Sequence, residues 1–252
     1  MQECRLIVGG GRQETRFESS ATYNMAVDEV LLQTAAAEDL PSLRFYGWMK
    51  PTVSLGYFQK LSDRELHSAS RHCELVRRAS GGGAILHDQE LTYCFATPTR
   101  ARFGETKDLY LAFHETLVEV LTELFGIQAA LHSAGDGVTN DAFLCFQRRA
   151  SGDVTCRGHK IAGSAQRRWK KAIFQHGSVI LAKSSHAPEL SGLREIAGFE
   201  GTQEVVISPW LRKLTSRLKI DASPGSLTDK EVAGVNRLIV EKFGNEAWTG
   251  RR

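Results

Sequence analysis

The sequence lacks any long apolar run. None of its 252 residues lie in a stretch of the eighteen or so consecutive apolar residues that a membrane-spanning helix needs, and no basic region followed by an apolar core stands at the N-terminus. The formal charge is only +3, too small to indicate a protein that binds nucleic acid through a basic face. We therefore expect a cytoplasmic protein that binds neither membrane nor nucleic acid, although the basic run 167–171 could meet an acidic partner protein.

Cysteine is scarce, and the patterns of several large enzyme classes are missing. The five cysteines are odd in number and widely spaced, and no two form a CxxC pair, which argues against a disulfide framework and against a zinc site. The sequence contains no GxGxxG, GxxxxGK[ST], HExxH or GxSxG pattern. The usual signals of dinucleotide-binding proteins, nucleotide-binding proteins, zinc proteases and serine hydrolases are therefore absent, and we expect no metal.

The apolar pattern alternates between a period of two and a period of 3.6, which predicts a mixed α/β fold. Helices are predicted over residues 23–37, 62–71 and 107–125, and a terminal amphipathic helix begins at the capping box of Thr228 and Glu231. Strands are predicted over residues 5–8, 43–46, 52–57, 74–78, 84–87, 91–96, 127–131, 154–156 and 172–181, with 74–78, 84–87 and 91–96 as neighbours. We expect one domain over 1–252, with a core at about 5–183, a surface connection at 184–201 and a C-terminal helical segment at about 205–245.

The segment Arg77 to His87 combines two arginines, three glycines and a histidine within otherwise apolar sequence. Glycines let a backbone approach a bound group closely, and fixed guanidinium groups favour phosphate or carboxylate nearby. Taken alone, the segment is equally consistent with a glycine-rich hairpin that carries two solvated arginines. The rest of the chain has to decide between these interpretations.

Three further side chains are candidates for chemistry. Lys160 stands among small residues, where a desolvated ammonium could stabilise an oxyanion, although an isolated lysine is more often exposed in a turn. Cys145 lies between aromatic residues and would ordinarily be an inert small hydrophobe, but a fifteen-residue loop could bring it to Lys160, and a nearby ammonium makes a thiol nucleophilic. His176, followed by glycine in a predicted strand, is by default a structural histidine.

Four motifs occur together, in an order that carries more information than any one of them. They are Asn24 to Glu29, the Arg77 to His87 segment with Glu90 to Tyr93, the Gly158 to Gln166 segment, and Gln175 to Ser178. Their order and spacing resemble the lipoate/octanoate protein ligase and transferase family over roughly residues 6–181. The resemblance implies the fold of that family and of biotin protein ligases, a central mixed β-sheet flanked by helices, with a tunnel for a medium-chain acyl group.

The resemblance also implies roles for individual residues. Cys145 would form an acyl thioester and Lys160 would contact the acyl carbonyl, as the two catalytic residues. The residues expected to bind substrate are Arg77, Arg78, Ser80, Gly81, Gly82, Gly83, Ala84, His87, Gly163, Ser164, Ala165, His176 and Gly177.

The subclass depends on Cys145. In the cysteine-dependent octanoyltransferases of the family a Cys-Phe pair precedes the GxKxxGSAQ segment, as Cys145-Phe146 does here. We therefore expect transfer of an octanoyl group from octanoyl acyl carrier protein to a lysine of a lipoyl domain or glycine cleavage H protein, by a monomer without cofactor. There are two alternatives. The enzyme could transfer the octanoyl group from one lipoyl-domain protein to another, or it could be a ligase that depends on ATP and Mg. Such ligases carry an Asn-Asp pair close before their lysine, and Asn140-Asp141 is a poor match because it precedes the cysteine.

Overall fold

The structure is a computed structural model that describes residues 1–9, 18–99, 106–133 and 142–252. Its strands are β1 (Gln2–Val8), β2 (Glu18–Ser19), β3 (Ser42–Trp48), β4 (Thr52–Leu55), β5 (Glu74–Arg77), β6 (Ile85–His87), β7 (Glu90–Pro98), β8 (Ala129–Leu131), β9 (Val154–Cys156), β10 (His159–Trp169), β11 (Ala172–Ile180) and β12 (Ile220–Pro224). Its helices are α1 (Ala21–Glu38), α2 (Thr106–Phe125), α3 (Leu193–Ala197), α4 (Gln203–Leu218), α5 (Asp229–Leu238) and α6 (Glu246–Thr249). Four short helical segments complete it: η1 (Leu61–Leu66), η2 (Ser68–Ser70), η3 (Cys145–Gln147) and the π-helical turn η4 (Ile239–Phe243).

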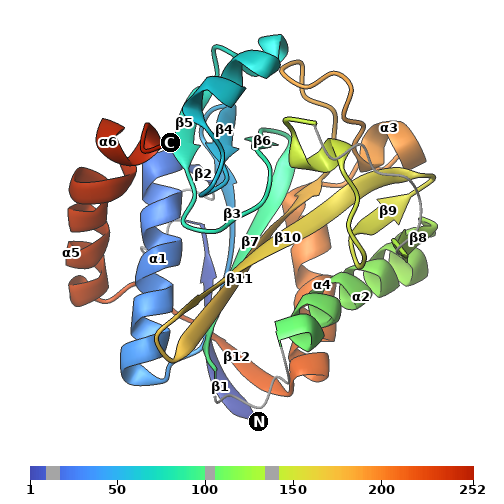
Figure 1. The fold of residues 1–252 in the computed structure, drawn as a ribbon. Helices are drawn as coiled ribbons and strands as arrows, with labels where there is room; N and C mark the ends of the chain where they lie inside the picture. Colours follow the sequence, from blue (N-terminus) through green and yellow to red (C-terminus); the bar gives the residue numbers. More distant parts are fainter. Residues whose placement is uncertain (10–17, 100–105, 134–141) are drawn as a thin grey trace.

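A mixed β-sheet forms the centre of the fold, in the order β12-β1-β3-β7-β11-β10-β9-β8, with β2 beside β3. A smaller sheet, β5-β4-β6, lies beside one end of it (Figure 1). The consecutive pairs β3–β7, β7–β11 and β11–β10 are antiparallel, and side chains opposite one another in their register share a face. This mixed sheet flanked by helices is the α/β architecture that the sequence predicts.

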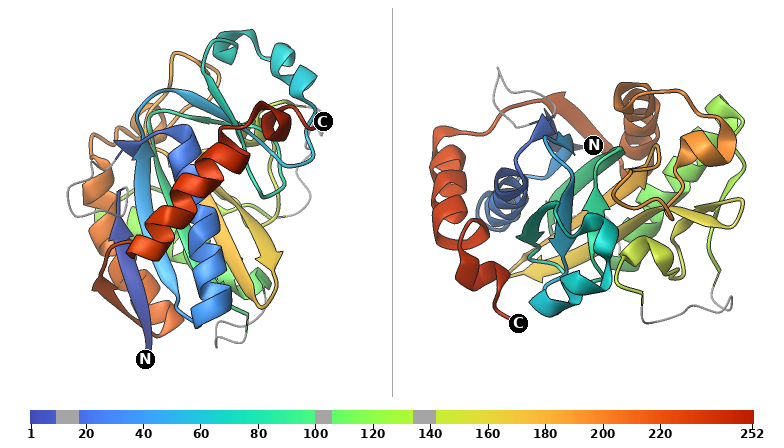
Figure 2. Two further views of the ribbon diagram at one scale, coloured as in Figure 1. Left: turned by 90° about the vertical axis from the view of Figure 1, so that its left-hand side faces the viewer. Right: turned by 90° about the horizontal axis from the view of Figure 1, so that it is seen from above.

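The two faces of the central sheet carry different cores. On one face Phe45, Tyr93 and Phe95 pack with Phe113 of α2 and Trp210 of α4. On the other face Tyr46 and Cys94 belong to a cluster that includes α1 and α5. Figure 1 shows α2 and α4 on one side of the sheet and α1 and α5 on the other, and the left view of Figure 2 looks onto α5 with α1 behind it.

Helix α1 is buried on nearly all sides because the sheet covers one side and α5 the other. Its buried acidic residues, Asp28 and Glu29, therefore have partners in the interior. Asp28 pairs with the buried Arg44 of β3 at 3.1 Å, and Glu29 pairs with Lys242 at 2.5 Å. No helix among the described residues is long and apolar enough to cross a membrane.

The strongly periodic segments fold as predicted, and the irregular ones do not. The helices predicted at 23–37 and 107–125 are confirmed as α1 and α2, and Gly126 ends α2 with a φ of +66°. The helix predicted at 62–71 is instead the two 3₁₀ segments η1 and η2. The expectation that 74–78, 84–87 and 91–96 are neighbouring strands is wrong, because β4 lies between β5 and β6, and β7 belongs to the central sheet.

Three strands are missing from the prediction: the two-residue β2, and β10 and β12. The longest, β10, lies over the Gly158 to Gln166 segment, whose small residues hide the alternation of a strand. The C-terminal segment expected to be helical also contains β12, which pairs with β1 in parallel and so adds a strand to the central sheet. The connection at 184–201 includes α3, whose Leu193 and Ile196 are buried.

A β-bulge in β10 sets the direction of one side chain. The pairing of β10 with β9 shifts between Lys160 and Ala162, so that Ile161 and Ala162 both face the α2 side of the sheet. Residues three apart in a regular strand lie on opposite faces, but the extra residue places Lys160 and Gly163 on the same face. A Cβ on Gly163 would lie only 2.6 Å from Lys160 Cε, so this glycine leaves room for the lysine.

The capping box of α5 is confirmed, and it supports a prediction on stability. Thr228 Oγ1 accepts a hydrogen bond from Glu231 N at 3.2 Å, and the Glu231 carboxylate accepts two from Arg5 of β1 at 2.6 and 2.7 Å. We expect Thr228→Ala to lower the free energy of unfolding by about 1 kcal/mol, measured by urea denaturation. Thr228→Ser keeps the hydroxyl and should lose less than half of this; equal losses would show that the cap contributes little.

Candidate active site

The glycine segment between β5 and β6 holds Cys145 directly. Cys145 N donates a hydrogen bond to Ala84 O at 2.7 Å, and Ala84 N donates one to Phe143 O at 3.1 Å. A Cβ on Gly83 would lie 3.3 Å from Cys145 Cα, closer than most side chains tolerate. The motif Arg77 to His87 therefore forms the support on which the η3 turn and its thiol rest.

The two arginines of the segment bind backbone carbonyls. The Arg77 guanidinium donates to Thr249 O, Gly56 O and Gln59 O at 2.7 to 2.9 Å. The Arg78 guanidinium, whose pKa burial lowers to about 10, donates to Ser54 O, Gly81 O and Gly83 O at 2.5 to 3.1 Å. Arg78 thus fixes the shape of the glycine turn, in which Gly82 has a φ of +94°.

Lys160 brings an ammonium to the thiol. Its Nζ lies 3.8 Å from Cys145 Sγ and 2.8 Å from Asp153 Oδ2, and both charged side chains are almost fully buried. A buried ion pair of this kind needs further hydrogen bonds to be stable. Asp153 receives them from Tyr110 OH at 2.9 Å and from Ala150 N at 2.6 Å.

A hydrogen-bond chain stands behind Asp153. His114 Nδ1 donates to the carbonyl of Gly152 at 2.6 Å, and burial lowers the pKa of His114 to about 4. The imidazole is therefore neutral at pH 7, and its Nε2 accepts a hydrogen bond from Ser164 Oγ at 2.6 Å. Ser164 in turn accepts one from Tyr93 OH at 2.5 Å. Ser164 thus orients the His114 ring and lies on the α2 side of the sheet.

Cys145 differs from the other four cysteines. All five are free, but Cys4, Cys73, Cys94 and Cys156 are buried, and burial raises the pKa of each. Cys145 is partly exposed and is the thiol that faces Lys160. Of the five, it has the access and the neighbouring cation that a nucleophile requires.

A narrow cavity lies on the α1 side of the central sheet, and Arg78, which lines it, also donates to the carbonyl of Gly83 beside Cys145. It crosses β10, β11, β7 and β3, and its lining includes Met25, Trp48, Arg78, Ala165, His176 and Gly177. In this form it holds about 20 Å³, enough for one water molecule, so an acyl chain can enter only if flexible lining side chains such as Met25 move.

Two histidines border this cavity, and each is held on both ring nitrogens. His176 contacts Ser80 Oγ at 2.6 Å and Asp28 Oδ2 at 3.3 Å, and burial lowers its pKa. His87 contacts Ser54 Oγ at 2.6 Å and Glu90 Oε1 at 2.6 Å, and its ring stacks on Trp48.

The structure brings most of the predicted site residues together. Five of them meet around the thiol: Cys145, Lys160, Gly83, Ala84 and Gly163. Five others line the cavity: Arg78, His87, Ala165, His176 and Gly177. Ser80 reaches the cavity through His176, and Phe58 packs over Gly81. Arg77 instead points to the C-terminal segment.

Asp153 is the residue that the sequence did not suggest. It is the only carboxylate between Cys145 and Lys160, which is the signal that could have found it. Asn140-Asp141 lies outside the described residues.

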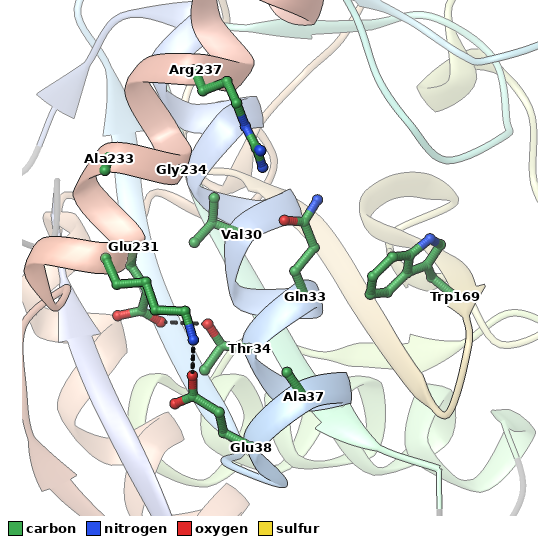
Figure 3. Close-up of a pocket in the computed structure, with 11 residues that line it drawn as sticks. Val30, Gln33, Thr34, Ala37, Glu38, Trp169, Glu231, Ala233, Gly234 and Arg237 are labelled. Atoms are coloured by element: carbon green, nitrogen blue, oxygen red, sulfur yellow. Dashed lines mark hydrogen bonds and ion pairs between the residues drawn. The ribbon is translucent and has the colours of Figure 1, made fainter.

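A wider groove of about 470 Å³ lies between α1, α5 and Trp169 (Figure 3). Three of its charged residues have partners within the groove: Lys230 pairs with Glu38, and Glu231 accepts a hydrogen bond from Thr34. None of the described residues that line this groove is a cysteine or histidine. We therefore place the candidate site around Cys145 and the smaller cavity.

Comparison with known proteins finds related sequences and structures. The family model of the lipoyl protein ligase A/B catalytic domain matches residues 20–196. Octanoyltransferase LipM of Moorella thermoacetica is 32% identical, over 91% of this chain and 93% of its own, and that of Kyrpidia tusciae is 31% identical over the whole of both chains. Protein Ta0514 of T. acidophilum, solved with lipoic acid bound, superposes with a TM-score of 0.79 at 21% identity, covering 99% of this chain and 100% of its own. Lipoate-protein ligase A bound with ATP superposes with a TM-score of 0.77 at 20% identity, covering 99% of each chain.

Proposed function

The chain belongs to the family of the lipoyl protein ligase A/B catalytic domain, and on that premise we propose that it is an octanoyltransferase of lipoate biosynthesis that carries the octanoyl group on Cys145. The observation that carries the covalent step is the 3.8 Å contact between Cys145 Sγ and Lys160 Nζ, with Asp153 holding the lysine from behind. A nucleophile, a fixed cation and an adjacent cavity are the parts that acyl transfer needs.

In the first step the Cys145 thiolate attacks the carbonyl carbon of an octanoyl thioester. The new C–S bond gives a tetrahedral oxyanion, and Lys160 Nζ is placed to donate a hydrogen bond to it. Collapse of the oxyanion breaks the bond to the carrier sulfur, which leaves as a thiol after taking up the proton that Cys145 has lost. The donor we propose is octanoyl acyl carrier protein.

In the second step the ε-amine of a lysine attacks the octanoyl-Cys145 thioester. An amide forms, the Cys145 sulfur leaves, and the proton lost by the amine returns to that sulfur. The acceptor we propose is a lipoyl-domain protein or glycine cleavage H protein. A thioester is already activated, so neither ATP nor a metal is part of this scheme.

The ligase alternative has no comparable observation in its favour. The guanidinium groups of Arg77 and Arg78 that would bind phosphate already donate to backbone carbonyls. Transfer between lipoyl-domain proteins would use the same thioester and differs only in the donor, so the experiment below includes that donor.

The protein should take up an octanoyl group without ATP. We expect intact-mass spectrometry to show one octanoyl adduct after incubation with octanoyl acyl carrier protein, and loss of this adduct on addition of H protein. A parallel incubation with octanoylated H protein tests the other donor. Modification of H protein only from free octanoate plus ATP, with no adduct on the enzyme, would contradict the transferase.

A further inference from the structure

A surface of apolar and cationic side chains lies beside the glycine segment. Phe58 is 68% exposed and Leu61 is 38% exposed, although both are large apolar residues. Lys60, Arg251 and Arg252 are also exposed, and none of the three has an ion-pair partner among the described residues. We call these five residues the Phe58 surface.

The two arginines of this surface rest on aromatic rings. The Arg251 guanidinium lies 4.3 Å from the ring centre of Tyr57 and 4.7 Å from that of Trp248. The Arg252 guanidinium lies 5.3 Å from the ring centre of Phe58. Contacts of this kind hold a guanidinium group in place without neutralising its charge. Both positive charges therefore stay available to a partner.

Hydrogen bonds to the backbone fix the Phe58 surface. The buried Arg77 guanidinium donates to Gln59 O and to Thr249 O, so it joins the segment after β4 to the segment after α6. Leu61 N donates to Arg252 O at 2.8 Å. Figure 1 shows the C-terminal end beside β5, the strand that carries Arg77. The role of Arg77 is thus to hold this surface together.

Positive charge is in excess at the Phe58 surface. Burial lowers the pKa of Arg77, and the nearby charges of Arg251 and Arg252 lower it further. The acidic residue that opposes them is Asp63, whose carboxylate also accepts a hydrogen bond from Lys60 N at 3.0 Å. Like charges held close together repel, so a partner that brings carboxylates would relieve this repulsion.

The Phe58 surface borders the thiol without covering it. The Phe58 ring packs over Gly81, and Gly83 supports Cys145. Two residues of backbone span at most about 7 Å. An acceptor lysine has a short side chain, so the acceptor has to cover Cys145 itself. A carrier that holds its thioester on a flexible prosthetic arm can bind beside the thiol.

We propose that the Phe58 surface binds an acidic face of the carrier protein that delivers the octanoyl group, an inference that rests on the proposed function. Carboxylates of the carrier face Arg251 and Arg252, and an apolar side chain of the carrier packs on Phe58. Charges at the rim of an interface act mainly on the rate of association. The surface therefore raises kcat/KM for the carrier and leaves the chemistry at Cys145 unchanged.

The test compares a donor with a protein and a donor without one. Acylation of Cys145 is followed by intact mass, first with octanoyl acyl carrier protein and then with the octanoyl thioester of N-acetylcysteamine. Reversing both charges with Arg251→Glu and Arg252→Glu should lower kcat/KM for the carrier by about tenfold or more. The rate with the small thioester should stay within about twofold of wild type. Added NaCl should slow wild type with the carrier and affect the variant much less.

Two further variants complete the test. Lys107→Glu with Arg212→Glu makes the same change in net charge at exposed positions of α2 and α4, and should leave both rates near those of wild type. Phe58→Ala removes an exposed ring and should raise KM for the carrier without changing the rate with the small thioester. If circular dichroism shows that the double arginine variant is unfolded, Phe58→Ala must give this result, or the inference is wrong.

The outcomes distinguish this inference from the proposed function. An equal loss with both donors would show that the arginines only support the active site, and unchanged rates with both would show that the carrier binds elsewhere. A loss confined to transfer from octanoyl-Cys145 to H protein would assign the surface to the acceptor. Each of these results overturns the inference and leaves the transferase intact. Wild type that forms no adduct with either donor overturns both.

Discussion

Replacing Cys145 with alanine should remove octanoyl transfer, by roughly 10⁴-fold or more in kcat/KM, because the variant has no atom that can form the thioester. The η3 turn should survive, since the hydrogen bonds from Cys145 to Ala84 and from Ala84 to Phe143 use backbone atoms. The measurement is the rate of octanoyl transfer to H protein, together with intact mass of the enzyme after exposure to octanoyl acyl carrier protein.

The matched control for Cys145→Ala is Cys156→Ala. Cys156 lies on β9, four residues before Lys160, but it is buried and burial raises the pKa of its thiol. This variant should keep its octanoyl adduct and a rate within a few-fold of wild type. Transfer by Cys145→Ala at a rate near that of wild type would mean that the acyl group passes directly from donor to acceptor without a thioester on the enzyme.

How far the sequence predicts this molecule depends on the residue types in each segment. Helices α1 and α2 are long and contain large apolar residues, so their positions follow from the sequence. Strand β10 does not, because glycine, alanine and serine give no contrast between its two faces. The order of the strands was also missed, since pairing of β4 with both β5 and β6 is decided by tertiary contacts and not by local spacing.

The candidate site was likewise predicted only in part from the sequence. The motifs place Cys145 and Lys160 in the sequence, but their approach depends on two features of the folded backbone. One is the bridge from Ala84 to Leu144, and the other is the bulge at Ile161 that turns Lys160 toward the α1 side. Asp153 was missed because its role arises only from that approach.

Replacing Lys160 should slow octanoyl transfer by roughly 10²–10³-fold, the usual loss when an oxyanion donor is removed. Lys160→Met keeps much of the side-chain volume and loses the ammonium that lies 3.8 Å from Cys145 Sγ and 2.8 Å from Asp153 Oδ2. Single-turnover kinetics should show both acyl transfers slowed, since each passes through an oxyanion at the same position.

A loss of activity in Lys160→Met has a second possible cause, because the variant leaves Asp153 as a buried charge without its cation. Removing one partner of a buried ion pair typically costs about 3–5 kcal/mol of stability. The double variant Lys160→Met with Asp153→Asn removes both charges and keeps an acceptor for Tyr110 OH. We expect it to regain most of the stability in urea denaturation while transfer stays about a hundredfold slow. If the double variant instead regains the wild-type rate, the lysine serves only to neutralise Asp153 and has no part in the reaction; if the rate stays low in a stable protein, the ammonium acts on the oxyanion.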